Sequence, residues 1–286
     1  MRPLQPRQAS SSPNVAIVVP LPLRTELLPE EEVSMRHLRH YLGAYDKYLV
    51  APPGHVVARD GFQMVTFPRV FFGSVAAHNR LLLSPSFYRA FRRYEYILIH
   101  HLDSLVFSDQ LTRWCGAGWD YIGAPWLPCE DTPWVSEPRV GNGGFTLMRV
   151  QSAIEVLHRR YRSQPLRYVG DVLVRNGRRA GALFKAIEQW HRVFPSESVR
   201  RLLDYRRKTD DPAESGYNSD FFWSYDAARY LPTFKVAPVT EGLQFAFEAA
   251  PRMCFELNHG TLPFGCHAWT KFDRAFWEPY LLPSRA

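Results

Sequence analysis

The sequence predicts an α/β fold with a mixed, mostly parallel, doubly wound sheet, flanked by helices in a single domain. Val15–Pro20 is an unbroken apolar run, and Tyr94–Asp103 gives the strongest strand signal in the chain and ends in polar residues. Both are typical of central strands that are covered on two faces. Segments with helical spacing alternate with these strands, which favours parallel pairing. A chain of 286 residues, 46% of them hydrophobic, can bury a core of this size.

The elements between these two strands follow from spacing and turn residues. In chain order we expect a helix over Glu30–Leu42, a strand over Lys47–Pro52, a strand over Gln63–Phe67, and a helix over about Ser74–Arg92 that is interrupted at Ser84–Pro85. Ligands of doubly wound sheets bind at the carboxyl ends of the strands. Asp103 is therefore predicted to lie at the mouth of a site.

The domain organisation is predicted to be simple. Residues 1–13 are rich in Pro, Ser, Gln and Arg and are typical of a flexible leader, so the domain spans 14–286. Within it, 157–210 is Arg-rich and helical, and this segment is a candidate insertion. The apolar run at Val15–Leu23 contains two prolines and is too short to span a bilayer. We expect neither a signal peptide nor a membrane anchor.

Charge and cysteine content narrow the classes of function. The net charge is +7 and only five of the 35 basic residues are Lys, but no motif of a nucleic-acid-binding domain is present. We therefore expect no specific nucleic-acid partner. The four cysteines form no Cys-x-x-Cys pair, which favours reduced thiols in the cytoplasm over a zinc knuckle or a disulfide framework.

Five segments in a fixed order carry a family resemblance. They are His101–Phe107, Trp119–Trp126, Val140–Met148, Asn218–Ser224 and Pro263–Trp269. This order resembles an uncharacterised bacterial family of glycosyltransferase-like domains, which is similar to the GT-A nucleotide-sugar glycosyltransferases. The similar region extends over most of the chain, and it implies a GT-A-like, Rossmann-like sheet.

The resemblance implies a divalent metal, Mn²⁺ or Mg²⁺, that neutralises the diphosphate of the sugar donor. GT-A enzymes usually hold it with an Asp-x-Asp motif, and here the corresponding residues read His-Leu-Asp, which makes Asp103 the carboxylate ligand. His101 and His267 are candidate nitrogen ligands, and such a mixed set suits manganese. A structural hydrogen-bonding role for His101 and a packed loop position for His267 are the alternatives.

The resemblance also implies a donor-binding surface. The glycine-rich stretch offers closely approachable backbone and one amide side chain for sugar hydroxyls, although glycines also mark ordinary turns. Trp126 is a candidate for stacking on a sugar or for plugging the core, and Asn79 and Arg80 are candidates for the base or the phosphates. The predicted donor-binding residues are Asn79, Arg80, Trp126, Gly141, Asn142, Gly143, Gly144 and Phe145.

Asp220 is the candidate catalytic base. In the similar enzymes an acid at this position takes the proton of the acceptor hydroxyl, and the reaction then inverts the anomeric carbon. The alternative is a helix cap, which the segment Asn218-Ser-Asp also fits. Glu248 and Glu256 have no motif support and receive no role.

The resemblance thus implies a hexosyltransferase that moves a sugar, from a UDP-sugar by preference, to a glycan, a lipid-linked acceptor or another glycoconjugate in bacterial polysaccharide biosynthesis. It would be cytoplasmic, and the Arg-rich segment would suit a peripheral membrane contact. The alternative from another class is a catalytically inactive GT-A-fold protein that binds carbohydrate or nucleotide, which the incomplete acid motif favours. A nucleotidyltransferase fits less well, since no glycine-rich loop follows Val15–Pro20.

Overall fold

A six-stranded sheet forms the centre of the computed structural model, which describes residues 14–55, 57, 59–163, 178–193, 195, 197, 199–200 and 218–283. In spatial order its strands are β3 (Gln63–Thr66), β2 (Asp46–Ala51), β1 (Val15–Pro20), β4 (Tyr96–His100), β9 (Phe145–Arg149) and β6 (Tyr121–Ile122). The first four are mutually parallel, and β9 is antiparallel to both of its neighbours. The expected α/β architecture with a mixed, mostly parallel sheet is confirmed.

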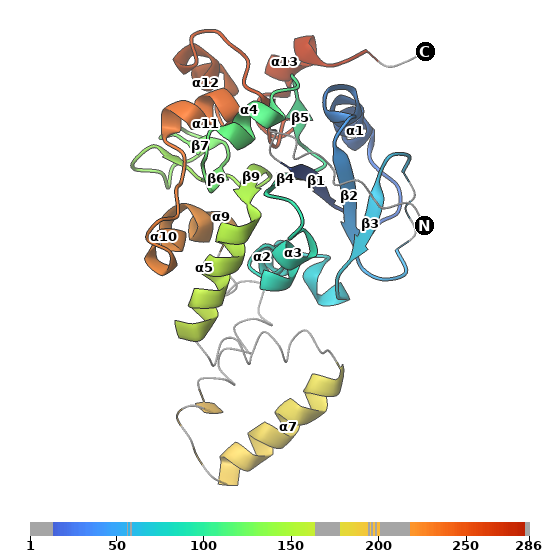
Figure 1. Cartoon of the computed structure of the whole chain (residues 1–286), viewed down its shortest axis with the longest axis vertical. Helices are drawn as coiled ribbons and strands as arrows, with labels where there is room; N and C mark the ends of the chain where they lie inside the picture. Colours follow the sequence, from blue (N-terminus) through green and yellow to red (C-terminus); the bar gives the residue numbers. More distant parts are fainter. Residues whose placement is uncertain are drawn as a thin grey trace, which may run out of the picture.

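The two central strands are apolar along their length because both faces of the sheet are covered. Alternate residues of β1 enter different clusters: Ala16 and Val18 pack in one core cluster and Ile17 and Val19 in another. Helix α1 (Pro29–Leu42) contributes to the second cluster, whereas α3 (Pro85–Ala90) and α5 (Val150–Ser163) contribute to the first (Figure 1). This two-sided burial explains why no polar residue interrupts Val15–Val19.

Most predicted boundaries agree with the structure to within one or two residues. The helix expected over Ser74–Arg92 is two helices, α2 (Val75–Leu82) and α3, because Pro85 cannot continue a helix and instead begins the next one. Ser74 caps α2 by accepting a hydrogen bond from the Ala77 amide at 3.1 Å. The last two residues of α2, Leu81 and Leu82, are buried in the core.

The remaining elements of the described chain are mostly short. They are η1 (Arg69–Phe71), β5 (Leu105–Val106), α4 (Leu111–Gly116), β7 (Pro125–Trp126), β8 (Arg139–Val140), α7 (Arg178–Val193), α9 (Ser219–Phe221), the π-helix η2 (Phe222–Asp226), α10 (Ala227–Tyr230), α11 (Val239–Phe245), β10 (Ala246–Phe247), α12 (Pro251–Leu257), β11 (Gly265–Cys266), α13 (Arg274–Trp277) and η3 (Glu278–Tyr280). β10, β11 and β5 form a separate three-stranded sheet, and β7 pairs with β8.

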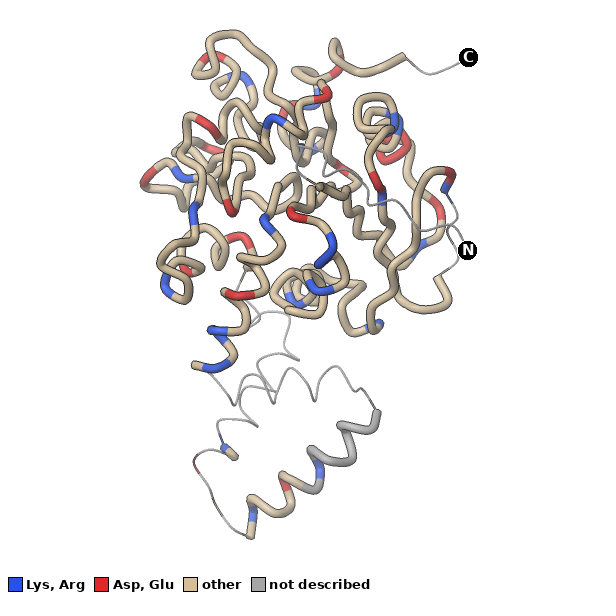
Figure 2. The backbone as a smooth tube through the Cα atoms, viewed as in Figure 1, with Lys and Arg blue, Asp and Glu red and all other residues tan. Residues whose placement is uncertain are grey.

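The predicted leader, residues 1–13, lies outside the described residues, as does much of the segment 157–210. The described part of that segment is helical as expected: it comprises the second half of α5 and the whole of α7, which lies away from the sheet (Figure 1). Several basic positions mark the C-terminal end of α5, while both charge signs are interspersed over the rest of the backbone (Figure 2). None of the described helices is long and apolar enough to cross a membrane.

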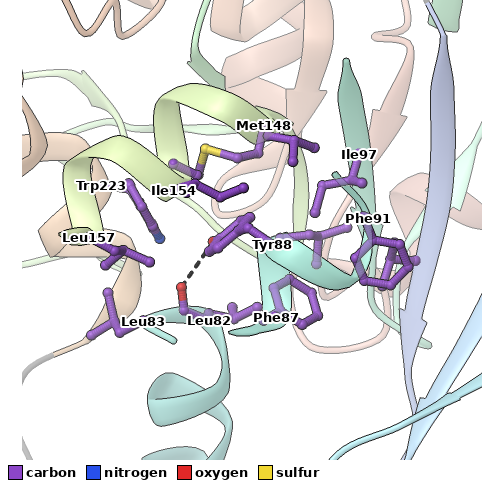
Figure 3. Close-up of a cluster of buried hydrophobic side chains, with 14 of the residues drawn as sticks. Leu82, Leu83, Phe87, Tyr88, Phe91, Ile97, Met148, Ile154, Leu157 and Trp223 are labelled. Carbon is purple, nitrogen blue, oxygen red and sulfur yellow. Dashed lines mark hydrogen bonds between the residues drawn. The ribbon is translucent and has the colours of Figure 1, made fainter. Parts of the chain in front are cut away.

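One core cluster is built around Tyr88, whose ring lies among the side chains of α3, α5 and η2 (Figure 3). Its hydroxyl donates a hydrogen bond to the carbonyl oxygen of Leu82 at 2.9 Å, and the tyrosine is fully buried. Burial raises the pKa of Tyr88 well above its usual range, so the hydroxyl stays protonated and remains a donor. The bond joins α3 to the C-terminal turn of α2.

We expect Tyr88→Phe to lower the free energy of unfolding by about 1–2 kcal/mol, because it leaves the buried Leu82 carbonyl without this donor. Urea denaturation followed by circular dichroism measures the loss. Tyr225→Phe is the control, since Tyr225 is 44% exposed and its substitution is expected to change stability little. Equal stability of Tyr88→Phe and wild type would contradict this account.

Candidate metal and substrate site

A cavity opens at the point where the order of the main sheet reverses. The chain proceeds from β1 outward through β2 and β3, and then returns to place β4 on the other side of β1. The segments that follow β1 and β4 diverge at such a switch point and leave a crevice at the carboxyl ends of the strands. The cavity here has a volume of about 720 Å³.

The cavity wall combines segments that lie far apart in the sequence. Its lining residues are Pro20–Arg24 after β1, Glu31, Phe71–Val75, His78, Asn79, His101–Asp103 after β4, Gly144, Asn218–Asp220 and His267. Asp103 therefore lies at the mouth of a cavity, as the position of its strand predicts.

Three side chains in this wall form a candidate metal site. His101, Asp103 and His267 each offer one ligand atom, and these atoms lie within 4.8 Å of one another. The Nε2 atom of His267 is 3.2 Å from the Asp103 Oδ1 atom. The structure thus brings together all three residues that the sequence singled out as candidate ligands.

The small sheet positions these residues. β5 pairs antiparallel with β11, and β11 pairs parallel with β10, so that Leu105 lies opposite Cys266 and Phe247 lies beside it. Glu248 and His267 each follow the paired end of a strand directly, and the carbonyl oxygen of Asp103 accepts a hydrogen bond from the Trp269 amide at 3.2 Å. Backbone pairing alone therefore holds an acid, a histidine and a second acid at one end of this sheet.

Glu248 fixes the orientation of His267. The two ring nitrogens of His267 face two carboxylates: Nε2 faces Asp103, and Nδ1 lies 3.0 Å from the Glu248 Oε1 atom. Asn142 donates a hydrogen bond from Nδ2 to the same Glu248 oxygen at 2.6 Å. A carboxylate behind a histidine is the usual way to aim the other ring nitrogen at a metal.

The charges at this cluster are strongly coupled. Burial by itself would lower the pKa of His267, but Asp103 and Glu248 outweigh it and raise the pKa to about 10. Burial would likewise raise the pKa of Asp103, but the neighbouring His267 lowers it well below its usual range. Without a metal, the protonated imidazole of His267 thus lies between the two acids and supplies one positive charge to the pair.

His78 adds a third imidazole at the edge of the cluster. Its Nε2 atom is 3.0 Å from Nε2 of His101, so one of the two rings donates and the other accepts. Burial, followed by the charge of His267, lowers the pKa of His78 to about 4. Both rings are therefore neutral near pH 7, the form in which histidine binds metals.

Asp220 lies in the same wall, where it packs on Gly143, next to the glycine on which His267 packs. Burial raises its pKa to about 6, although the Gly143 amide donates a hydrogen bond that favours the carboxylate. The helix cap at this point is Asn218, whose side chain accepts a hydrogen bond from the Asp220 amide at 2.9 Å. The Asp220 carboxyl is thus not the cap, and it remains directed at the cavity.

Three glycines let the backbone of 141–144 approach three side chains closely. A Cβ atom at Gly141 would lie 2.2 Å from the Trp126 ring, one at Gly143 would lie 2.2 Å from Asp220 Oδ1, and one at Gly144 would lie 2.1 Å from His267 Nε2. No side chain can be tolerated at these distances without a shift. Trp126, Asp220 and His267 therefore pack directly on the glycine-rich loop, at Gly141, Gly143 and Gly144 respectively.

The predicted donor-binding residues occupy different places in the structure. Asn79 and Gly144 line the cavity, and the Asn79 Oδ1 atom accepts a hydrogen bond from the Ser219 hydroxyl at 2.8 Å. The other six do not line it: Gly141, Asn142, Gly143 and Phe145 lie behind the wall, Trp126 is 4% exposed beneath other aromatic rings, and Arg80 donates to the Val70 carbonyl. Arg24, which the sequence did not single out, brings a guanidinium to the wall.

Glu248, His78 and Arg24 are the site residues that sequence reasoning missed. Glu248 follows a two-residue strand, β10, which is too short to give a periodic pattern. His78 lies on the same helix as Asn79, where a single histidine gives no indication of its partner. Only the fold shows that Glu248 and His78 contact the cluster and that Arg24 lines the same cavity.

The donor set fits a transition-metal ion better than magnesium. One carboxylate oxygen and two imidazole nitrogens are available among the described residues. Mg²⁺ prefers oxygen ligands and retains water, whereas imidazole nitrogen is a good ligand for Zn²⁺ and Fe²⁺, and mixed nitrogen and oxygen sets also hold Mn²⁺. Of the two ions expected from the sequence, manganese is the better match to these residues.

Comparison with known proteins identifies the family. Residues 61–267 match the family described as "Protein of unknown function (DUF5672)", and the chain belongs to it. No curated protein matches the sequence. Among solved structures, the chain is similar to one titled "Crystal Structure of A197 from STIV", with 9% identity and a TM-score of 0.28, over 49% of this chain and 66%, just under two thirds, of that one.

We expect Gly144→Ala to lower the free energy of unfolding by about 1–3 kcal/mol, because the added methyl group would overlap the His267 ring. Urea denaturation in the presence of a chelator measures the effect without any contribution from a metal. Gly116→Ala is the matched control, because a Cβ atom there has nothing within 4 Å. Equal stability of the two variants would contradict the close packing of His267 on Gly144.

We also expect Asp220→Asn to raise the free energy of unfolding. The gain should be about 1 kcal/mol larger at pH 8 than at pH 5. The folded pKa of about 6 exceeds the ordinary value of 3.8, so the ionised Asp220 destabilises the folded state increasingly as the pH rises from the ordinary value through about 6. The amide does not ionise. Denaturation of both proteins at the two pH values tests this, and an identical difference at both would indicate an ordinary carboxyl group.

Proposed function

We propose that this chain is a GT-A-type glycosyltransferase that moves a sugar from a nucleotide-sugar, preferably a UDP-sugar, to an acceptor hydroxyl with inversion. The observation that carries the proposal is the shared cavity at the switch point. Its wall holds the His101, Asp103 and His267 cluster and also Asp220, a carboxyl group with a raised pKa. The reaction needs a group that stabilises the leaving diphosphate, which a bound metal would supply, and a base for the acceptor hydroxyl.

The family resemblance gains support from how the five motif segments fold. His101–Phe107, Val140–Met148, Asn218–Ser224 and Pro263–Trp269 each place at least one residue in the cavity wall. The remaining segment, Trp119–Trp126, supplies the ring that packs on Gly141. Segments that are up to about 160 residues apart thus converge on one site, which a chance sequence similarity would not require.

The donor diphosphate would lie between the cluster and the first helical turn of α2. A divalent ion held by His101, Asp103 and His267 would neutralise the diphosphate as it leaves. Gly73, Ser74 and Val75 line the cavity at the N-terminal end of α2, where free amide groups and the helix dipole favour an anion. The Arg24 guanidinium lies in the same wall, although it currently pairs with Glu31.

Asp220 is the proposed base. With a pKa of about 6 it is largely ionised at pH 7, yet it holds a proton more strongly than an ordinary aspartate, as a general base requires. The Gly143 amide and the Ser219 hydroxyl, which is 3.2 Å from Oδ1, hold the carboxylate in place. It would take the acceptor proton while the acceptor oxygen attacks the anomeric carbon.

A catalytically inactive protein that binds nucleotide or carbohydrate is the second candidate. The observation that favours it is the single carboxylate of the cluster, which leaves the metal with fewer acidic ligands than an Asp-x-Asp motif gives. Such a protein would bind the nucleotide but would not cleave the sugar–phosphate bond.

We expect wild-type protein to bind UDP in calorimetry with Mn²⁺ and more weakly with Mg²⁺, and Asp103→Ala to weaken the Mn²⁺-dependent binding at least about tenfold, because a metal ligand is lost. Asp60→Ala, an exposed acid that does not line the cavity, is the control. Failure of every nucleotide to bind would overturn the proposed function.

We expect Asp220→Asn to retain donor binding but to lose at least about 100-fold in turnover of a UDP-sugar, because the base is removed. Slow hydrolysis, in which water replaces the acceptor, is the measured reaction. The wild-type rate should rise as the pH increases through about 6, since the base acts only when it is ionised. Donor binding without hydrolysis in the wild type would favour the inactive alternative.

A further inference from the structure

Outside the cavity, an exposed aromatic cluster lies close to Asp220. Four aromatic side chains among the described residues are strongly exposed, and three of them, Trp134, Phe221 and Tyr225, gather at one place. Their exposed fractions are 51%, 38% and 44%. We call these three residues the aromatic platform. Exposed aromatic rings that gather in one patch mark a binding surface more often than isolated ones do.

The rings of the platform pack against one another in a defined geometry. The Phe221 and Tyr225 rings are stacked, with an interplanar angle of 18° and centroids 5.7 Å apart. Trp134 lies 5.2 Å from the Phe221 ring, and the buried Trp126 supports all three rings from beneath. The exposed rings therefore rest on a fixed base.

Arg139 connects the two segments of the chain that carry the platform. Its guanidinium lies 4.3 Å from the centroid of the Tyr225 ring, and its Nε atom donates to the Ser224 hydroxyl at 2.9 Å. Ser224 in turn donates to the Val140 carbonyl at 2.6 Å. The hairpin of β7 and β8, which carries Trp126 and Arg139, is thereby joined to the helical turn that follows Asp220.

The core does not need the exposed rings. In the π-helix and the residue before it, Phe222 and Trp223 point into the core and are almost fully buried, whereas Phe221 and Tyr225 face outward. Polar side chains would serve on that outer face if only solubility mattered. π-helical turns are also frequent at functional sites.

The platform is close to the proposed base. Gly141 packs on Trp126 and Gly143 packs on Asp220, and two residues of extended chain span at most about 7 Å. Phe221 also follows Asp220 directly in the chain. None of the three exposed rings lines the cavity, so the platform lies beside the proposed donor site and does not form part of it.

The charges at the platform are of both signs, since the Arg139 guanidinium lies over the Tyr225 ring and acids flank Trp134, so they favour neither an anion nor a cation as the occupant. The segment 127–138, which carries Trp134, contains Glu130, Asp131 and Glu137 and no Lys or Arg. Such a segment repels an anionic lipid surface or a phosphate chain. Flat rings that are bordered by charged and hydroxyl groups suit a sugar, which has an apolar face and hydroxyl groups at its edge.

We propose that Trp134, Phe221 and Tyr225 form a subsite for the acceptor, and that the acceptor is a neutral carbohydrate whose ring stacks on these side chains with a hydroxyl directed at Asp220. This inference rests on the proposed function for the role of acceptor. It places the acceptor on the 221–225 side of Asp220 and the donor on the cavity side.

The test is a binding screen of the full chain against a panel of defined neutral oligosaccharides, with quenching of tryptophan fluorescence by acrylamide as a second readout. We expect at least one oligosaccharide to bind and to protect Trp134 from quenching. Trp134→Ala and Tyr225→Ala should each weaken binding about three- to tenfold, whereas Tyr225→Phe, which keeps the ring, should not. Trp190→Ala is the matched control, because Trp190 is also 51% exposed but lies on α7.

UDP binding with Mn²⁺ is measured on the same proteins, which separates this inference from the proposed function. Normal UDP binding in a protein that binds no oligosaccharide would overturn the subsite alone. Oligosaccharide binding at the platform without any nucleotide binding would uphold the carbohydrate subsite and overturn the transferase. Binding to phosphatidylglycerol vesicles that is lost in Trp134→Ala, without sugar binding, would show that the occupant is a lipid surface and overturn the inference.

Discussion

The candidate site depends on the close approach of one backbone segment, Gly141–Gly144, to three side chains from other parts of the chain. Each glycine leaves room for one functional group, so the loop acts as a common reference for Trp126, Asp220 and His267. The Gly144 carbonyl also accepts hydrogen bonds from the His101 amide at 2.8 Å and the Ser104 hydroxyl at 3.2 Å. A shift of this backbone would therefore displace the candidate base Asp220 and the candidate metal ligands His101 and His267 together.

A few hydrogen bonds hold the ionisable groups around His267 in place. The chain of hydrogen bonds from the Gly144 amide through Asn142 and Glu248 to His267 links the loop to the ring that rests on it. Each member satisfies the polar atoms of the next, so that partly buried groups have partners. The three candidate ligand atoms are thereby held within 4.8 Å of one another.

The sequence predicted the fold well because the main sheet is built from long, regular elements. The apolar runs of β1 and β4 and the proline at Pro85 can be recognised locally, and they also locate Asp103 at a strand end. His267 was named as a candidate metal ligand only through a family resemblance. Glu248 was not identified, because its position depends on pairing between two-residue strands that give no periodic pattern.

The donor-binding surface predicted from the sequence shows the opposite limit. A glycine-rich stretch can either bind a ligand or accept neighbouring side chains, and the sequence does not distinguish between an empty space and a filled one. Here the space above Gly141 and Gly143 is filled by Trp126 and Asp220. Arg80 and Arg24 present the same difficulty, since both are arginines near the first strands and only the backbone path determines which one reaches the cavity.

The π-helix Phe222–Asp226 has a consequence for how this surface could arise and vary. A π turn is an α-helix with one extra residue, and successive residues of an α-helix are separated by about 100° around its axis. Deleting one residue would therefore restore a regular helix and change the spacing and angle between the Phe221 and Tyr225 rings, which now stack, while the buried Phe222 and Trp223 could keep their places. Among related chains, single-residue insertions and deletions at this turn would be a route by which the outer aromatic face is gained or lost while the core is preserved.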